Sequence, residues 1–287
     1  SSLPIPTSIR DAIQTRLEPL GEIPRALVGV LAVARQEIDL DLLCMAAVMD
    51  VDRVTSGMEI LIDAGLVRER QLGEMERFEL AQNRLKDVVL EGMSIALKQR
   101  IHRRIGEAME RIHRRRISFV VEALAYHFEQ GEVASKAYPY LIQAADKLMQ
   151  RTFVSEALEY LERAIRIEPD AREYMTLDDA DSRLADLRLK RAKALYHLGH
   201  LNHSRDELGR AGDLAQALGD VRLQIGVHTE KGCQARRVRE LDAAEESLQL
   251  AIDLAREKGH RRLEILPLYE RGGVAWARGD LESARDW

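Results

Sequence analysis

The chain has 287 residues, of which 46% are hydrophobic, 32% charged and 5% aromatic, which is enough for one large domain or two ordinary ones with proper cores. Its 43 Lys and Arg residues against 48 Asp and Glu residues give a formal net charge of −5. This charge excludes a protein whose whole surface attracts polyanions such as nucleic acid. No apolar run approaches the roughly 20 residues that a membrane span needs. Cys44 and Cys233 form no framework of disulfides or zinc thiolates. We therefore expect a helical chain in a reducing cytoplasm, without membrane contact.

The region 1–80 indicates a small helical domain that ends in a β-hairpin. Ile9, Ile13 and Leu17 recur at helical spacing after Ser8, which can cap that helix. The run 26–34 is almost wholly apolar and predicts a buried central helix. Two short helices are expected to start at Asp39 or Asp41 and at Asp50 or Asp52, and the runs 66–69 and 77–80 predict strands around a loop at 71–74. This region thus has the outline of a winged helix.

A winged helix raises the possibility of DNA binding, because its third helix often enters the major groove. Here that helix would span 52–64, and three of its six polar side chains are acidic, namely Asp52, Glu59 and Asp63. Phosphate repels such a face, so a packing role is favoured.

The next region, 81–117, is a basic helical connector. The stripe at 98–116 contains Arg103, Arg104, Arg114 and Arg115, which could bind an anionic partner. The alternative is a solvated helix face, because apolar residues recur on the other side and no aromatic side chain is interleaved with the stripe. Nucleic acid is therefore the disfavoured partner.

Beyond residue 117 the chain repeats itself. Gly219 and Gly259 differ by 40 positions, as do the pairs Leu208 and Leu248, Ala211 and Ala251, and Gly232 and Gly272. Each unit reads as a helical hairpin, with helices at about 184–198 and 204–218 and a turn at Gly199. We divide this part into first repeat-like helices at 118–169, an acidic linker or hinge at 170–183, and repeats of 40-residue period at 184–287, the last one truncated.

The repeat pattern resembles the second helix of a tetratricopeptide repeat (TPR). The series of a small residue, Leu and Ala appears at Ser204, Leu208 and Ala211. It also appears earlier, at Ala157, Leu161 and Ala164, and Pro169 follows that series where such repeats commonly end. Stacked repeats of this kind have a concave surface lined by their first helices. By position, we expect Lys193, Tyr196, Arg236, Tyr269 and Trp276 to line it, where aromatic and cationic groups suit a peptide or a small anionic ligand. Ordinary packing between repeats is the alternative for each aromatic.

The common motifs for nucleotide binding, metal-assisted hydrolysis and serine hydrolase chemistry are absent from the sequence. His197, His200 and His203 surround the turn at Gly199, which breaks the helical geometry that a shared metal would need. We therefore predict no enzyme activity, no cofactor and no metal for this chain.

Three stretches together resemble the bacterial regulators known as STAND proteins, which are signal-transducing P-loop ATPases. The segment LPIPTSIRDAI at 3–13 is similar to the one that follows their ATPase core. The segment FELAQNRLKDVV at 78–89 is similar to their F-x-F-A-H-D-R-I-R-E-A signature, with Gln82 and Asn83 in place of His-Asp. The segment HRRIG at 102–106 resembles their L-H-x-x-I-G helix, with Ile101 in place of Leu.

This resemblance implies an all-α chain with one small β-hairpin, in which a winged-helix-like domain precedes a solenoid of TPR-like hairpins. It implies a non-catalytic sensor that binds a protein, a peptide or a small inducer in its groove and contacts an ATPase core elsewhere. The effector would be a kinase, a cyclase or a transcriptional regulator. We expect the chain to belong to a longer polypeptide, since it stops inside a repeat. A stand-alone TPR scaffold and a nucleic-acid binder that uses the stripe at 98–116 are the alternatives.

Overall fold

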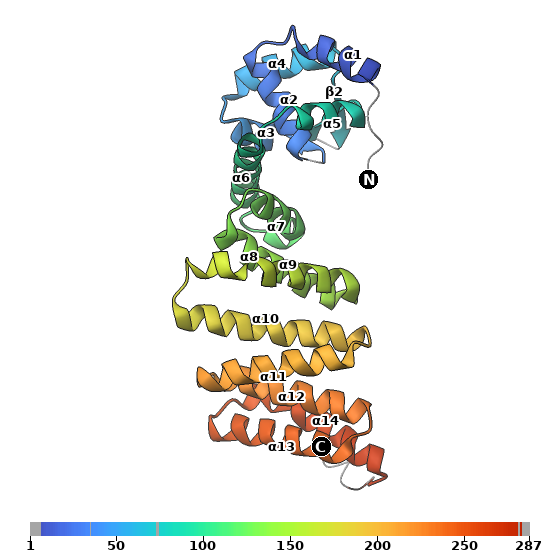
Figure 1. Ribbon diagram of the computed structural model, residues 1–287, viewed down its shortest axis with the longest axis vertical. Coiled ribbons are helices and arrows are strands. Elements are labelled where there is room, and N and C mark those ends of the chain that lie inside the picture. Colours follow the sequence, from blue (N-terminus) through green and yellow to red (C-terminus); the bar gives the residue numbers. More distant parts are fainter. Residues whose placement is uncertain (1–6, 35, 73–74, 281, 283–287) are drawn as a thin grey trace. The chain divides into compact units, whose positions relative to one another are not determined.

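The computed structural model describes residues 7–34, 36–72, 75–280 and 282 (Figure 1). The fold is α-helical with one small sheet, as the sequence predicts. The chain divides into two compact units, unit 1 at residues 1–140 and unit 2 at residues 141–287.

Unit 1 contains the small sheet and the helices around it. It begins with helices α1 (Thr7–Leu17), α2 (Glu22–Ala34), α3 (Leu40–Ala47) and α4 (Val51–Asp63). Strand β1 (Ile38–Asp39) lies between α2 and α3, and strands β2 (Val67–Leu72) and β3 (Met75–Leu80) follow α4. Strand β3 lies between β1 and β2 and is antiparallel to both. The predicted hairpin is therefore present, and β1 adds a third strand that the sequence did not indicate. Gly73 and Glu74 of the predicted loop lie outside the described residues.

The core of unit 1 forms around α2. Its residues from Leu27 to Ala34 are all buried, which confirms the prediction for the apolar run. Asp39 and Asp50 are the caps of α3 and α4, because their carboxylates accept hydrogen bonds from the N–H groups of Leu42 and Arg53 at 2.8 and 2.9 Å. Ser8 lies inside α1, which begins one residue before it, so the predicted cap at Ser8 is wrong.

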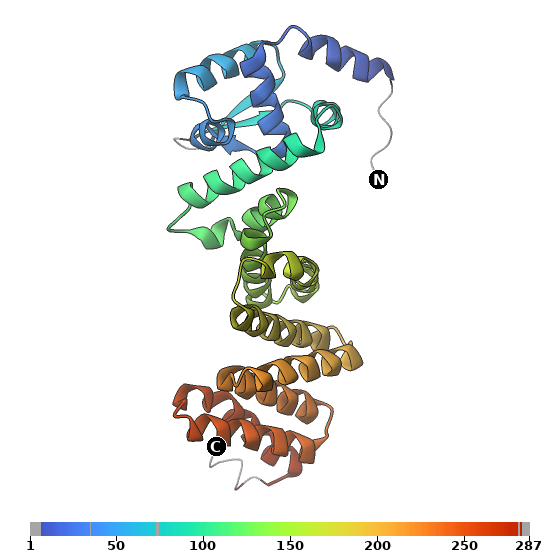
Figure 2. The same ribbon diagram turned by 60° about the vertical axis from the view of Figure 1, so that its left-hand side comes forward.

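The predicted connector is part of unit 1. Helices α5 (Asn83–Glu91) and α6 (Ile95–Ile112) both pack against α2, and α6 also contacts α3 and α7 (Val121–Gln130), as Figure 2 illustrates. The short helix η1 (Ile117–Phe119) precedes α7, and α8 (Ala134–Gln150) follows it. The apolar faces of α5 and α6 are buried, including Leu85, Ile101 and Ile105, which is why these helices join the core.

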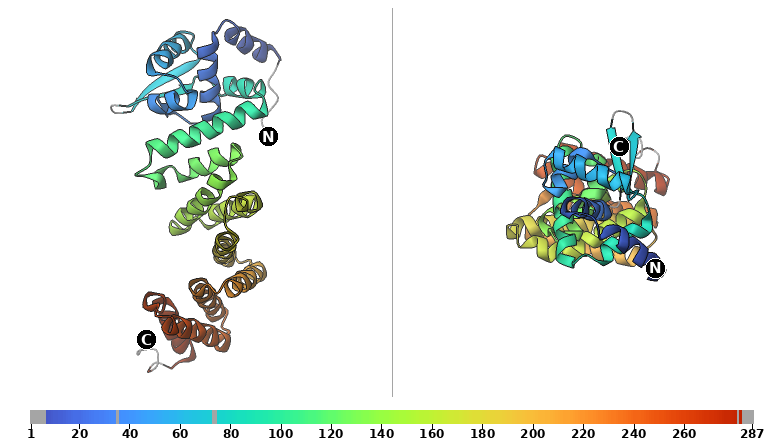
Figure 3. Two further views of the ribbon diagram at one scale, coloured as in Figure 1. Left: turned by 90° about the vertical axis from the view of Figure 1, so that its left-hand side faces the viewer. Right: turned by 90° about the horizontal axis from the view of Figure 1, so that it is seen from above.

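Unit 2 is a stack of helices. Beyond α8 these are α9 (Val154–Arg172), α10 (Leu177–His197), α11 (Leu201–Ala217), α12 (Val221–Arg237), α13 (Leu241–Glu257), η2 (Arg261–Leu263) and α14 (Ile265–Arg278), of which α10–α14 can be followed in Figure 3. Helices α10 and α11 form one hairpin and α12 and α13 the next, as the repeat period predicts. We call α10, α12 and α14 the first helices of the repeats, and α11 and α13 the second helices. Gly199, with a φ of 83°, forms the predicted turn.

The acidic segment at 170–183 is not a linker. Helix α9 continues to Arg172, past Pro169, and α10 begins at Leu177, so only residues 173–176 connect them. Thr176 caps α10, and Asp178 and Asp179 occupy its first turn, where negative charge is stabilised by the helix dipole. Arg172 forms ion pairs with Asp181 and Glu168. The acidic residues therefore start a helix, and the predicted hinge is wrong in this respect.

Small residues allow the helices of a repeat to approach closely. A Cβ atom added to Gly232 of α12 would lie 2.4 Å from Cγ of Leu248 and 3.1 Å from the carbonyl oxygen of Ala244, both on α13. Ala192, at the equivalent position of α10, is fully buried with Leu208 and Ala211 of α11. The spacing of each hairpin thus depends on the absence of a larger side chain on its first helix.

The close contact at Gly232 predicts the effect of a single methyl group. Gly232→Ala is expected to lower the free energy of unfolding by about 1–3 kcal/mol, because Leu248 and the backbone of α13 must move. Gly209→Ala in α11 is the matched control, since its added Cβ meets nothing within 4 Å, and it should raise stability by about 0.5–1 kcal/mol. Urea denaturation of the whole chain measures both changes. A similar change in both variants would contradict the packing argument.

Candidate functional site

The predicted concave surface is built on the three first helices. Helix α12 contacts α10 and α14, so the three helices lie in the order α10, α12 and α14. Lys193 of α10 and Glu230 of α12 are 3.9 Å apart, and Arg236 of α12 and Glu270 of α14 are 2.7 Å apart. Each first helix is therefore joined to the next by an ion pair between residues of this surface.

Arg236 is held firmly between two first helices. Its Nε donates a hydrogen bond of 2.7 Å to Glu270, whose side chain is buried. Its guanidinium group also covers Gly273, where an added Cβ would lie 3.2 Å from Nε. The sequence predicted a ligand-facing cation here, whereas the structure gives Arg236 a carboxylate partner within the protein.

Tyr196 lies at the end of α10 and is half-buried. The guanidinium carbon of Arg237 lies 5.6 Å from the centre of its ring, which is the geometry of a cation–π contact. Tyr196 also lines a cavity formed mainly by α11, α12 and α13. Tyr196 therefore belongs to a first helix and also lines this cavity.

Tyr269 and Trp276 are the two aromatic residues that α14 exposes. Their relative exposures are 71% and 70%, and Ile265 and Leu266 of the same helix are exposed as well. Thr229 of α12 and Leu189 of α10 occupy the position of Tyr269 in the two preceding repeats, and each is only 6% exposed. The difference arises because α10 and α12 are each covered by the next first helix, whereas no described helix covers α14 in the same way.

The predicted basic residues belong to unit 1. Arg103 and Arg104 lie on α6, and Arg114 and Arg115 follow its end. Nε of Arg103 donates a hydrogen bond of 2.5 Å to the carbonyl oxygen of Gly131, which gives this arginine a structural contact. Arg114 and Arg115 are exposed.

Sequence reasoning did not find two polar contacts near this stripe, one of them buried and the other partly buried. His102, which falls within the stripe, is buried, and its Nδ1 lies 3.0 Å from Nδ1 of His127 on α7. Glu110 accepts hydrogen bonds from Lys136 at 2.5 Å and from the hydroxyl group of Tyr140 at 2.7 Å. Burial and this bond to a carboxylate raise the pKa of Tyr140 above its ordinary value. No sequence spacing joins these partners, which are far apart along the chain.

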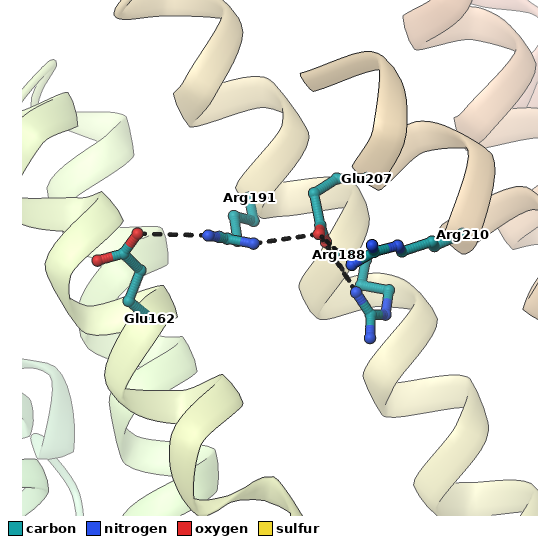
Figure 4. A network of polar contacts seen from close by, with 5 residues as sticks. All are labelled: Glu162, Arg188, Arg191, Glu207 and Arg210. Carbon is teal, nitrogen blue, oxygen red and sulfur yellow. Dashed lines mark hydrogen bonds and ion pairs between the residues drawn. The ribbon is translucent and has the colours of Figure 1, made fainter. Parts of the chain in front are cut away.

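A polar network in the repeats surrounds Glu207 of α11 (Figure 4). Its side chain is 4% exposed and lies 3.1 Å from both Arg188 and Arg191 of α10 and 3.4 Å from Arg210. Arg191 also reaches Glu162 of α9 at 3.4 Å. This network therefore links three successive helices through one buried carboxylate.

The cavity beside Tyr196 has a volume of about 230 Å³. Its walls combine aliphatic and polar side chains, which are Leu201, Arg205, Leu208, Lys231, Gln234, Ala235, Val238, Glu240, Ala243 and Ser247. Such a mixture of apolar walls and a few polar groups is typical of a site for a small ligand.

Two classes of feature are absent from the described part of the chain. Within it, no three His, Cys, Asp or Glu side chains are grouped so that they could hold a metal ion. His197, His200 and His203 are exposed. Among the helices of the described residues, none is long and apolar enough to cross a membrane.

Comparisons with known proteins give likenesses of structure alone. No protein-family model and no curated protein sequence matches the chain. The alignment with the crystal structure of aspartyl phosphate phosphatase F from Bacillus subtilis covers the whole of the present chain and 74% of the phosphatase chain, at 12% identity and a TM-score of 0.52. The alignment with a STAND protein with a tetratricopeptide repeat sensor from Pyrococcus horikoshii covers the whole of the present chain and 46% of the chain of that protein, at 15% identity and a TM-score of 0.41. The repeat region of the present chain is accordingly a TPR-like helical solenoid.

The Glu207 network predicts a large loss of stability when its carboxylate is removed. Glu207→Ala is expected to lower the free energy of unfolding by roughly 3–5 kcal/mol, because three guanidinium groups lose their buried counter-charge. Glu246→Ala, at an exposed position of α13, should change stability by less than about 0.5 kcal/mol. Chemical denaturation compares the two variants. Equal small losses would show that the network contributes little.

The thiol of Cys233 is expected to be unreactive in the folded chain. Burial, followed by the negative charges of Glu270 and Glu230, raises its pKa from 9.0 to about 12. In a Cys44→Ser background, an aromatic disulfide reagent at pH 8 should modify folded Cys233 at least about a hundredfold more slowly than the urea-unfolded chain, because the thiolate is the reactive form. Comparable rates in both states would contradict this burial.

Proposed function

We propose that this chain is a non-catalytic sensor region of a larger signal-transduction ATPase. In this proposal, the first-helix surface of the repeats binds a protein, a peptide or a small inducer. Unit 1 acts as a winged-helix-like element that relays the bound state to a nucleotide-binding core elsewhere in the protein.

The observation that carries the proposal is the exposed aromatic pair Tyr269 and Trp276 on α14. TPR-like solenoids offer extended surfaces for partners, and exposed Tyr and Trp side chains are the residues that most often supply binding energy there. Lys193 and Arg236 lie on the neighbouring first helices and are each paired with a carboxylate. Their role is therefore to hold the aromatic surface in place, whereas the aromatic pair makes the contact.

Unit 1 supports the relay part of the proposal through its architecture. It has the helices and the three-stranded antiparallel sheet that a winged helix needs. The motifs at 78–89 and 102–106, which are similar to those of STAND regulators, lie on β3, α5 and α6. A ligand must favour one arrangement of the repeats and unit 1 over another, because equal affinity for both would shift nothing.

A capture experiment with matched aromatic variants tests the proposed surface. The purified chain is used as bait in extracts of its source organism, and retained proteins and small molecules are identified by mass spectrometry. Tyr269→Ser and Trp276→Ser should each reduce the retained partner at least about tenfold, because each removes a large exposed contact.

Tyr174→Ser is the matched control, since Tyr174 is 71% exposed, as Tyr269 is, but lies on the connection between α9 and α10. This variant should retain the partner as the unchanged chain does. A partner that binds equally well to the double variant at Tyr269 and Trp276 would remove the α14 surface from the proposal.

A further inference from the structure

The cavity beside Tyr196 contains a cation that has no counter-charge among the described residues. Lys231 of α12 lines this cavity, and no hydrogen bond or ion pair joins it to any described residue. Its ammonium nitrogen lies 3.8 Å from the point where a Cβ of Gly212 would be, on a part of α11 that bears no side chain. The charge is felt nearby, because burial and then Lys231 lower the pKa of His228. Lys231 is half-buried beside the cavity, and charges inside proteins are usually paired.

The neighbouring repeats show which contact is absent. Lys231 stands one repeat period after Arg191 and one repeat period before Arg271, at the same position of the first helix. Arg191 pairs with Glu207 of the following second helix at 3.1 Å. Arg271 pairs with Glu245 of the preceding second helix at 3.5 Å. In both flanking repeats, a carboxylate of an adjacent second helix neutralises this cation.

Both carboxylate positions are changed around Lys231. The residue one period after Glu207 is Ser247, and the residue one period before Glu245 is Arg205. Ser247 and Arg205 line the cavity together with Lys231. Glu240, the acidic residue among the described lining residues, is paired with Arg205 at 2.9 Å. The cavity therefore occupies the place of an ion pair that the flanking repeats make within the protein.

We propose that this cavity binds the carboxylate group of a small aliphatic acid. The ammonium group of Lys231 pairs with the carboxylate of the ligand, as Arg191 and Arg271 pair with carboxylates of the protein. The hydroxyl group of Ser247 can donate a hydrogen bond to the same carboxylate of the ligand. Leu201, Leu208 and Val238 line the cavity and would contact the hydrocarbon part of the ligand. This site is separate from the Tyr269 and Trp276 pair of the proposed function, and either can fail without the other.

Calorimetric titration of the whole chain with hexanoate, and with the neutral analogue hexanamide, tests the site. Hexanoate should bind and hexanamide should bind at least about tenfold more weakly, because a charge-assisted hydrogen bond is lost. Lys231→Met should reduce hexanoate binding to the level of hexanamide. Lys258→Met removes an exposed lysine that does not line the cavity, and it should leave hexanoate binding unchanged.

A second variant restores the ion pair that the flanking repeats have. Ser247→Glu places a carboxylate at the position equivalent to Glu207, so it should pair with Lys231, raise the melting temperature and abolish hexanoate binding. Ser247→Gln, of nearly the same size but neutral, should give a smaller rise in melting temperature or none.

Three results would overturn the assignment. The first is an absence of hexanoate binding to the unchanged chain. The second is unchanged hexanoate binding in Lys231→Met or in Ser247→Glu, with folding of each variant verified by circular dichroism. The third is binding of an end-blocked glutamyl tripeptide at least tenfold more tightly than hexanoate, which would assign the cavity to a side chain of a partner protein instead.

Discussion

The close approach of paired helices is the constraint on which the repeat region depends. A helical hairpin of this kind cannot bury its apolar faces alone, so stability comes from stacking on its neighbours. Stacking at this distance requires small side chains where helices cross, and Ala192, Ala211 and Ala251 are fully buried at such points. Gly232 leaves no room for a methyl group beside Leu248. The small residues recur at a regular period in the sequence because each hairpin requires this spacing.

The charged contacts follow from the same spacing. Once first helices are held at a regular distance, long side chains at equivalent positions meet the neighbouring helix in a similar way. Arg191 and Arg271 each find a carboxylate on an adjacent second helix, and Glu207 alone serves three arginines. Because desolvated charges are costly without partners, the departure at Lys231 stands out against this regular background. A repeat architecture thus makes an unpaired group interpretable, since its neighbours show what the paired state looks like.

Local patterns predicted the elements well, whereas contacts between distant segments escaped them. The apolar run of α2, the hairpin β2–β3 and the repeat hairpins follow from periodicity and turn residues. The two-residue strand β1 exists only because Ile38 pairs with Phe78, which lies far along the chain. The acidic residues before Leu184 indicated a linker by composition, yet Asp178 and Asp179 occupy the first turn of α10, which Thr176 caps. His102 belonged to a basic stripe by sequence, and only the fold reveals its burial against His127. Each miss concerns a partner that a single stretch of sequence does not contain.

The aromatic residues of α14 gain their meaning from position within the solenoid. Inside the stack, the positions of Leu189 and Thr229 are covered by the next first helix, so both side chains are buried there. At Tyr269 the same position is exposed. Covering a large aromatic side chain that is exposed to water lowers the free energy. The surface that a following helix would use is therefore also the surface that a partner could use. In the proposed function, a partner on this face would use the same geometry by which repeats stack, since it would cover the exposed side chains of α14.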